Sequence, residues 1–353
     1  MYNNEMERNF HTKNKKKGEK QMKNKILILL QLLLMTALFA ACGSSAQDEA
    51  NADRPTPTVK SMTMGTGGTT GTYYAFGNVL SGYMNDASGI FINVVSTGGS
   101  TANIYNIDDT VNQLGTVQSD VMSYAWDGSK SFAADGEIHS FRVLGGLYEE
   151  AVQIVTMDED IKTVADLKGK TVSIGAPGSG VYFNAIDVLG AYDLTEEDIR
   201  AEYLSFGEST DAMKDGKVDA AFIVSGAPTN AITELSTTNG VYLVNIEDEK
   251  ADILIERCPY YNKHTIAGGT YGSLPEDTHT VSIKATMIVS AQSSEQDVYQ
   301  LTKGIYDNIE GIAGVHAKGN ELSLENATTG MPVPFHAGAA KYFAEKGITV
   351  PVE

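Results

Sequence analysis

The chain has 353 residues, of which 42% are hydrophobic and 20% charged, with 35 glycines and only 9 prolines. This is the composition of a globular protein, and it excludes a mostly disordered, collagen-like or polytopic membrane chain. The net charge is −19: residues 1–41 hold eight Lys or Arg against three acids, which leaves 18 basic and 42 acidic residues in the remainder. So acidic a body argues against nucleic-acid binding, which needs a basic surface.

Residues 1–41 have the pattern of an export signal. A basic run precedes a 16-residue apolar stretch, Ile26 to Ala41. That stretch is short for a membrane span and has the flanks of a secretory signal. Small residues stand directly before Cys42, as in the bacterial lipobox, in which the cysteine is acylated; the alternative is an ordinary signal peptide followed by an incidental cysteine. Met22 begins a normal signal of this kind, and the pattern leaves open whether the residues before it are translated.

Residues 42–58 are small, polar and interrupted by proline. We expect them to form a flexible tether, spanning about 20 Å, between a lipid anchor at Cys42 and the folded body. One other cysteine, Cys258, follows, and an exported protein with one remaining thiol has no intrachain disulfide framework. We therefore expect Cys258 to be packed and inert, and the body to lie outside the cytoplasm, anchored to the cell membrane.

The body shows one order of elements twice. In its first half, strands at Val59–Met64, Phe91–Val95 and Asp120–Tyr124 alternate with helices that open at Gly/Thr-rich turns, the second helix reaching about Gln113. The second half has the same order, with strands at 171–174, 201–205 and 219–224. Strands that alternate with helices form parallel sheets with right-handed crossovers. The sequence therefore predicts an α/β protein with two similar lobes.

Two long apolar segments connect these lobes. We expect Phe141–Met157 to pass from the first lobe to the second and Thr280–Ser290 to pass back, so that the first lobe takes up the C-terminus. Two such crossings make a clamp with two hinges. We place lobe 1 at residues 59–147 plus 279–353, and lobe 2 at residues 148–278.

Clusters of Gly, Ser and Thr lie at the strand-to-helix turns, where open α/β sheets bind ligands. Each turn presents the unpaired N–H groups and the positive dipole end of a helix. Facing turns from two lobes predict one cleft for a small polar, anionic molecule; the alternative is that these residues only cap helices. Arg142, at the start of the first crossing, either reaches this cleft or makes a surface ion pair.

Other kinds of site lack their motifs. The turn at Gly65 has neither the lysine of a P-loop nor the third glycine of a dinucleotide-binding turn. The histidines of the body are scattered without metal-ligand spacing, and the G-x-S-x-G motif of serine hydrolases does not occur. We therefore expect no metal, no cofactor and no enzymatic activity.

Eight stretches, spread over nearly all of residues 59–348, resemble the TAXI-type solute receptors of TRAP transporters. They are MGTGGTTGTYYAFGNVLS, STGGSTANI, QSDV, FRVLGGLYEEAVQIV, DLKGKTVSIGAPGSG, GKVDAAFIVSGAP, GGTYG and MPVPFHAGAAKYFAEKG. The resemblance implies a type II periplasmic-binding-protein-like fold, in which two parallel-rich βαβ lobes close on a ligand. It also implies the capture of a small organic acid or amino acid, similar to glutamate or 2-oxoglutarate, for a TRAP membrane permease. The alternative is the same module as the sensor input of a signalling partner.

The resemblance also places the ligand contacts, on the glycine-rich turns and close to them. The expected ligand-binding residues are Gly67, Thr69, Thr70, Tyr74, Ser96, Gly99, Ser100, Asn103, Gln118, Tyr148, Gly178, Ser179, Gly180, Ser225 and Gly226. There is one departure from the family pattern. Many relatives carry a basic residue early in the helix after the PGSG turn, and this chain has Ala185-Ile186-Asp187 there.

Overall fold

The computed structural model describes residues 56–272 and 274–352. The predicted signal, Cys42 and most of the predicted tether lie outside the described residues. The last residues of that tether contact helix α10 (Glu295–Tyr306), because the Thr58 amide donates to Asp297 Oδ1 at 3.0 Å and Gln296 Nε2 donates to the Thr56 carbonyl at 2.9 Å. Within the described part of the chain, no helix has the length and apolarity that crossing a membrane requires.

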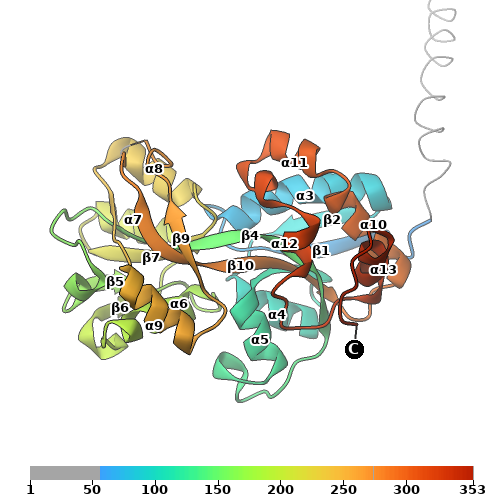
Figure 1. The fold of residues 1–353 in the computed structure, drawn as a ribbon, viewed down its shortest axis with the longest axis horizontal. Coiled ribbons are helices and arrows are strands. Elements are labelled where there is room, and N and C mark those ends of the chain that lie inside the picture. The colour runs from blue at the N-terminus through green and yellow to red at the C-terminus, as the bar shows by residue number, and fades with distance from the viewer. Residues whose placement is uncertain (1–55, 273, 353) are drawn as a thin grey trace, which may run out of the picture. The chain divides into compact units, whose positions relative to one another are not determined.

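One ten-stranded sheet runs through the described unit in the order β2-β1-β3-β10-β4-β7-β5-β6, with β8 beside β4 and β9 beside β10. Its strands are β1 Ser61–Gly65, β2 Phe91–Val95, β3 Leu114–Gln118, β4 Phe141–Thr156, β5 Thr171–Ser173, β6 Arg200–Glu202, β7 Ala220–Ser225, β8 Tyr242–Leu243, β9 Asn262–Ile266 and β10 Thr278–Ser290. The two longest, β4 and β10, lie in the middle of the sheet (Figure 1).

The sheet contains the predicted repeat. β1 pairs in parallel with β2 and β3, and β5 pairs in parallel with β6 and β7, so each lobe has the same strand order. The two crossing segments pair antiparallel with each other, and they join the lobes by pairing antiparallel with β3 and β7. The lobes are therefore two halves of one continuous sheet, linked through β4 and β10.

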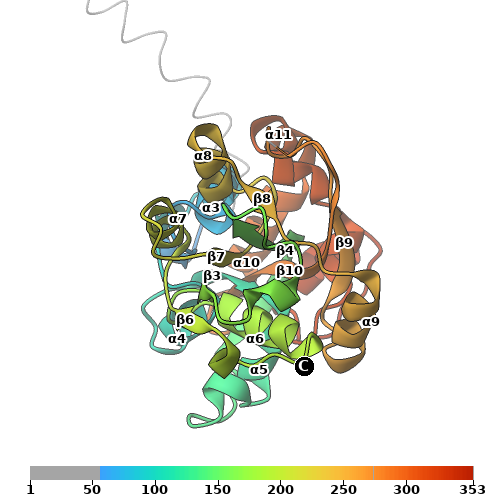
Figure 2. The same ribbon diagram turned by 90° about the vertical axis from the view of Figure 1, so that its left-hand side faces the viewer.

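Helices cover the sheet in both lobes, as Figure 1 and the perpendicular view in Figure 2 show. Around β1–β3 they are α3 Thr72–Ser88, α4 Ser100–Asp108, α5 Ser119–Trp126, α10 Glu295–Tyr306, α11 Ile309–Val315, α12 Leu324–Thr328 and α13 Ala337–Glu345. Around β5–β7 they are α6 Val181–Ala191, α7 Phe206–Lys214, α8 Asn230–Thr238 and α9 Asp248–Arg257. Short 3-10 turns complete the described elements: Lys130–Phe132, Val164–Leu167, Glu196–Asp198 and Ala317–Glu321.

Each lobe has its own core, and apolar periodicity explains how the helices join it. On α3, Phe76, Leu80 and Met84 recur every four residues, and all three are buried. Burying one side chain of this size contributes about 2 kcal/mol. On β4, Tyr148 belongs to the core of lobe 1, whereas Val152 belongs to a core of lobe 2. The lobe boundaries stay predictions. The point on β4 where side chains pass from the core of lobe 1 to that of lobe 2 lies close to the predicted boundary at residue 148.

Two expected elements of lobe 1 are wrong. The third strand is Leu114–Gln118, and the predicted strand at Asp120–Tyr124 lies in helix α5. The helix that was expected to reach Gln113 ends at Asp108, and Thr110 then takes the left-handed conformation, with a φ of 60°. Every residue of β3 and all but the last of α5 are buried, so the apolar pattern alone did not show which stretch was the strand.

Candidate ligand-binding cleft

A cleft lies between the lobes, at the carboxyl ends of their parallel strands. Its volume is about 80 Å³, enough for several water molecules or one small ligand, since one water needs about 10–15 Å³. Its lining is drawn from both lobes and from β4. The lining residues are Gly67, Gly68, Gly71, Thr72, Tyr73, Thr97, Gly98, Gly99, Ser100, Gln118, Glu150, Ala176, Ser179, Gly180, Val181, Ser205, Phe206, Val224 and Ser225.

Three helices begin at this cleft with a glycine as N-cap. Gly71 precedes α3, Gly99 precedes α4 and Gly180 precedes α6, and none of the three has a side-chain hydrogen bond at its cap. The N-terminus of α7 differs, because Ser205 accepts a hydrogen bond from the Glu208 amide. The first N–H groups of a helix need an acceptor from outside it. Two of these N–H groups are already paired, that of Thr72 with Ser225 Oγ and that of Ala102 with the Gly178 carbonyl. The remaining donors and the positive dipole ends of the glycine-capped helices can serve an anionic group in the cleft.

Close contact between two glycine-rich turns narrows the cleft. The Ala102 amide of lobe 1 donates to the Gly178 carbonyl of lobe 2 at 3.1 Å. A Cβ atom added to Gly98 would lie 2.8 Å from the Pro177 carbonyl oxygen. Gly99 has a φ of 110°, which residues with side chains rarely adopt, and a Cβ atom added there would lie 3.4 Å from Ser179 Cα. Glycine is therefore required here for the lobes to approach one another.

Four polar side-chain atoms that line the cleft have no hydrogen-bond partner. They are the Tyr73 hydroxyl, Gln118 Oε1, Glu150 Oε1 and Ser179 Oγ. Most buried polar atoms in proteins are paired, because an unpaired one costs free energy. The opposite end of the Gln118 amide is fixed, since its Nε2 donates to Asn184 Oδ1 at 2.9 Å. A set of orphaned oxygens around one cavity marks the place where a ligand would supply the missing partners.

The electrostatics of the cleft are unusual for an anion site. Glu150 is 2% exposed, and burial raises the pKa of its carboxyl to about 8, although the Tyr73 hydroxyl and the Gln118 amide partly oppose this rise. Burial and the nearby Glu150 charge raise the pKa of Tyr73 as well. None of the described residues that line the cleft is Lys, Arg or His. Anion binding would therefore rest on helix N-termini rather than on a cationic side chain.

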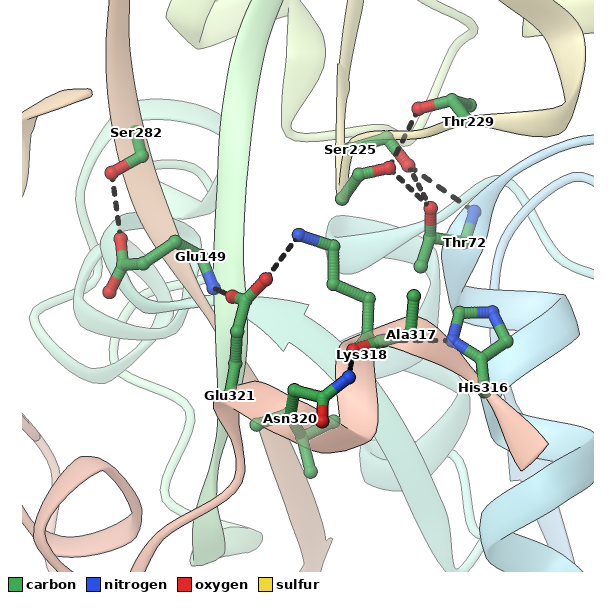
Figure 3. Close-up of polar contacts among 12 residues, drawn as sticks. Thr72, Glu149, Ser225, Thr229, Ser282, His316, Ala317, Lys318, Asn320 and Glu321 are labelled. Atoms are coloured by element: carbon green, nitrogen blue, oxygen red, sulfur yellow. Dashed lines mark hydrogen bonds and ion pairs between the residues drawn. The ribbon is translucent and has the colours of Figure 1, made fainter. Parts of the chain in front are cut away.

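The back wall of the cleft joins α3 to the end of β7 (Figure 3). The Thr72 amide donates to Ser225 Oγ at 3.2 Å, and the Thr72 hydroxyl donates to the Gly226 carbonyl at 2.9 Å. Behind this wall Lys318 is buried, with its ammonium paired to Glu321 and 5.6 Å from the centre of the Tyr148 ring. Lys318 is a cation next to the site, but it is not among the residues that line it.

Seven of the fifteen expected ligand-binding residues line the cleft: Gly67, Gly99, Ser100, Gln118, Ser179, Gly180 and Ser225. The other eight lie outside the lining: Thr69, Thr70, Tyr74, Ser96, Asn103, Tyr148, Gly178 and Gly226. This placement tests only the geometry, and the role of each residue in binding stays a prediction.

Several residues outside the lining hold the walls in place. Asn103 Nδ2 donates to the Thr66 and Thr116 carbonyls at 2.7 and 2.8 Å, which fastens α4 to β3 and to the turn after β1. The hydroxyl of Ser96 donates to the Gly67 carbonyl at 2.9 Å. The Tyr148 ring packs against Phe76, with its hydroxyl unpartnered. These side chains shape the cleft from behind it.

The sequence analysis missed Glu150, Tyr73, Thr97 and Phe206 as lining residues. A signal for Glu150 was present, because it is a carboxylic acid in a strand whose next five residues, Ala151 to Val155, are apolar except for Gln153. Alternation along a strand also places it on the same face as Tyr148, which was expected to bind ligand. Arg142 does not line the cleft, and its guanidinium lies 5.1 Å from the centre of the Trp126 ring.

Comparison with known proteins identifies the family of the chain. The model of the NMT1-like family matches residues 64–347, which includes every lining residue of the cleft. The chain belongs to the NMT1-like family. Within residues 56–272 and 274–352 of this NMT1-like protein, no group of three or more His, Cys, Asp or Glu side chains is placed to hold a metal ion.

Solved structures similar to this NMT1-like protein show its fold. A protein of Bordetella bronchiseptica RB50 matches with a TM-score of 0.51 and 14% identity, over 82% of this chain and 90% of that one. PhnD1 of Prochlorococcus marinus, solved with methylphosphonate, matches at 0.50 and 10% identity, over 74% and 90%. The alkanesulfonate-binding protein SsuA of Xanthomonas axonopodis pv. citri, bound to MOPS, matches at 0.46 and 16%, over 84% and 92%.

The predicted two-lobed, periplasmic-binding-protein-like fold is confirmed by the likenesses to the Bordetella protein and to PhnD1 and by the sheet itself. The family match does not extend to the TAXI assignment, which stays a prediction.

Proposed function

We propose that this NMT1-like protein is an extracytoplasmic receptor that binds one small organic acid or amino acid between its lobes. One observation carries the proposal: three helices with glycine N-caps begin at a single cleft, and that cleft also holds four polar atoms without partners. A carboxylate at such helix starts would receive backbone N–H donors without a cationic side chain. Among the described lining residues there is neither a histidine nor a cysteine, which favours binding over turnover.

We further propose that the receptor passes its solute to a TRAP-type permease. The support is the resemblance of motifs such as STGGSTANI and DLKGKTVSIGAPGSG to the TAXI receptors. The lipid anchor at Cys42 would hold the receptor at the membrane surface next to such a permease. A TRAP-type permease is driven by an ion gradient, whereas other transporters that use receptors of this fold are driven by ATP. The driving force of uptake therefore distinguishes the two classes.

Calorimetry and small-angle scattering test the receptor function. A panel of the twenty amino acids, succinate and 2-oxoglutarate is titrated into the purified full-length chain. A ligand should raise the melting temperature by mass action, and it should reduce the radius of gyration because the lobes close on it. If no member of the panel binds at millimolar concentration, the proposed ligand class is wrong. An unchanged radius at saturation would contradict the clamp.

Uptake into membrane vesicles tests the permease class. Vesicles from the source cells, depleted of ATP and loaded with the receptor, should take up the labelled ligand when an ion gradient is imposed. Collapse of that gradient with an ionophore should abolish uptake. Uptake that needs ATP and ignores the gradient would overturn the TRAP assignment and leave the receptor function standing.

A further inference from the structure

Glu150 is a buried carboxyl, and no cation among residues 56–272 and 274–352 contributes to its pKa. It is 2% exposed, it lines the cleft, and its Oε1 has no hydrogen-bond partner. Its Oε2 lies 3.5 Å from Gln118 Nε2, at the limit of a hydrogen bond. A carboxylate in such a place is costly unless a charged or hydrogen-bonding partner compensates it. No described residue that lines the cleft supplies a positive charge.

Two more oxygens without partners share the cleft with Glu150. They are Gln118 Oε1 and the Tyr73 hydroxyl. Glu150 and Ser100 lie close enough to the Tyr73 hydroxyl to affect its pKa, but neither forms a well-aligned hydrogen bond with it. Together with Glu150 Oε1 they make three acceptors, one of them on an ionisable acid. A primary ammonium group carries three N–H donors and one positive charge. The number of acceptors and the charge therefore both match an ammonium group.

We propose that the ligand carries a primary ammonium group that binds Glu150, so that the site takes a small amino acid rather than a dicarboxylic or 2-oxo acid that lacks an amino group. This inference rests on the proposed receptor function and narrows its ligand class. The two ends of an amino acid would meet the two kinds of partner in the cleft. Its carboxylate would lie at the starts of α3, α4 and α6, and its ammonium group at Glu150, Gln118 and Tyr73.

Proton linkage gives the proposal a signature. Burial raises the pKa of Glu150 to about 8, so the empty site holds this carboxyl neutral at pH 7. An ammonium ligand favours the ionised form, so its binding releases a proton, and its affinity rises with pH until about pH 8. An acid that accepts a hydrogen bond from neutral Glu150 behaves in the opposite way, and its affinity falls above pH 8. The groups that face Glu150 are Tyr73 on α3, Gln118 on β3, Asp120 on α5, and Tyr148 and Glu149 on β4.

Matched ligands and matched variants test the inference by calorimetry. Each amino acid that binds the full-length chain is compared with the same acid lacking its amino group, in the wild type, Glu150→Gln and Glu149→Gln. Glu149 is the control because it is the neighbouring acid on the strand, its carboxylate accepts from Ser282 Oγ at 2.8 Å, and it does not line the cleft. We expect Glu150→Gln to weaken amino-acid binding at least tenfold and the amino-free acid about twofold or less. Glu149→Gln should change each affinity by no more than about twofold, because the charge of Glu149 is only a minor cause of the raised pKa of Glu150.

The outcomes separate this inference from the receptor function. If an acid without an amino group, such as succinate or 2-oxoglutarate, binds as tightly as any amino acid, the ammonium site is wrong and a receptor for organic acids remains. Failure of the whole panel to bind would overturn both. If Glu150→Gln does not fold, the wild type alone decides, by titration at pH 7 in two buffers of different ionisation enthalpy. Release of up to one proton on amino-acid binding supports the inference, and zero release or proton uptake overturns it.

Discussion

Two serines on opposite walls of the cleft have different surroundings. Ser100 Oγ accepts a hydrogen bond from the backbone N–H of Gln118 at 3.1 Å, so the Ser100 side chain already supports lobe 1 without a ligand. Ser179 Oγ is buried and has no partner. One serine therefore contributes to the fold as well as to the cleft, whereas the other has its hydroxyl free for a ligand.

Alanine at these two positions should separate stability from binding. Ser179→Ala should change the free energy of unfolding by less than about 0.5 kcal/mol. It should weaken ligand binding roughly 5- to 150-fold, which corresponds to about 1–3 kcal/mol for one desolvated hydrogen bond. Ser100→Ala should also lower the free energy of unfolding by about 1 kcal/mol, since the backbone N–H of Gln118 loses its acceptor. Denaturation and calorimetry measure the two quantities. Early melting with normal binding in both variants would contradict the assignment of these walls to the site.

Asp120 should make stability fall as the pH rises. Burial raises the pKa of this carboxyl from 3.8 to about 7, although the Val121 amide opposes the rise. The folded state therefore binds more protons than the unfolded state between about pH 4 and pH 7. Its contribution, up to roughly 4 kcal/mol, is present below this window and lost above it.

Asp120→Asn should flatten the stability profile in that window. The measurement is urea unfolding at several pH values from 4 to 8 in both proteins. Glu150 and Asp187 also have raised pKa values because they are buried, so the wild type keeps a slope of the same sign and only the difference between the two profiles reports Asp120. Parallel profiles would show that Asp120 titrates normally in the folded protein.

At the scale of elements, the turns before α4 and α6 set how closely the lobes approach. Gly98→Ala would place a Cβ atom 2.8 Å from the Pro177 carbonyl of the other lobe. We expect it to disfavour the closed form, weaken ligand binding at least tenfold and reduce the contraction seen by small-angle scattering. Gly82→Ala is the control, because Gly82 does not line the cleft and a Cβ there meets nothing within 4 Å. Equal contraction in the two variants would exclude this contact as a limit on closure.

The sequence was most informative where strands and glycine-rich turns alternate. Both crossings were predicted, and so were both parallel units apart from the third strand of lobe 1, because period and turn chemistry agree in those stretches. The pattern failed at β9 and α9, which were not predicted. β9 lies beside β10 and buries only Ile266, so it has no regular alternation. α9 fully buries only Ala251 and Leu254, while Ile253 and Ile255 are partly buried against the core, so its apolar residues do not form a clear stripe.

The candidate site was predicted only in part for a related reason. Backbone turns can be located from local sequence, and residues on the three glycine-capped turns were found to line the cleft. Glu150 has its role only because β4 carries it past Gln118 of β3 and Tyr73 of α3, two contacts that depend on tertiary packing. The reverse holds for Asn103, for which the family resemblance implied ligand binding, whereas its side-chain amide donates to two backbone carbonyls.

For the whole molecule, the predicted lipid anchor at Cys42 would decide where the proposed receptor works. Cys42→Ser should leave a protein that is exported and soluble, because the acylated thiol is the expected link to the membrane. Membrane fractionation and intact-mass measurement check this, with wild type carrying a lipid mass and the variant none. Cys258→Ser is the control and should fractionate with the wild type. Unmodified wild-type protein in the soluble fraction would contradict the lipoprotein assignment.

The central position of β10 has a consequence for biosynthesis. This strand, Thr278–Ser290, lies between β3 and β4 and pairs with both, yet four-fifths of the chain precedes most of it. Chains emerge from the ribosome N-terminus first, so β3 keeps an unpaired edge until this late strand has been made. A chain without its central strand cannot complete the sheet that unites its lobes. The order of synthesis would therefore leave the sheet incomplete until about four-fifths of the chain has been translated, which suits the proposed export of the protein.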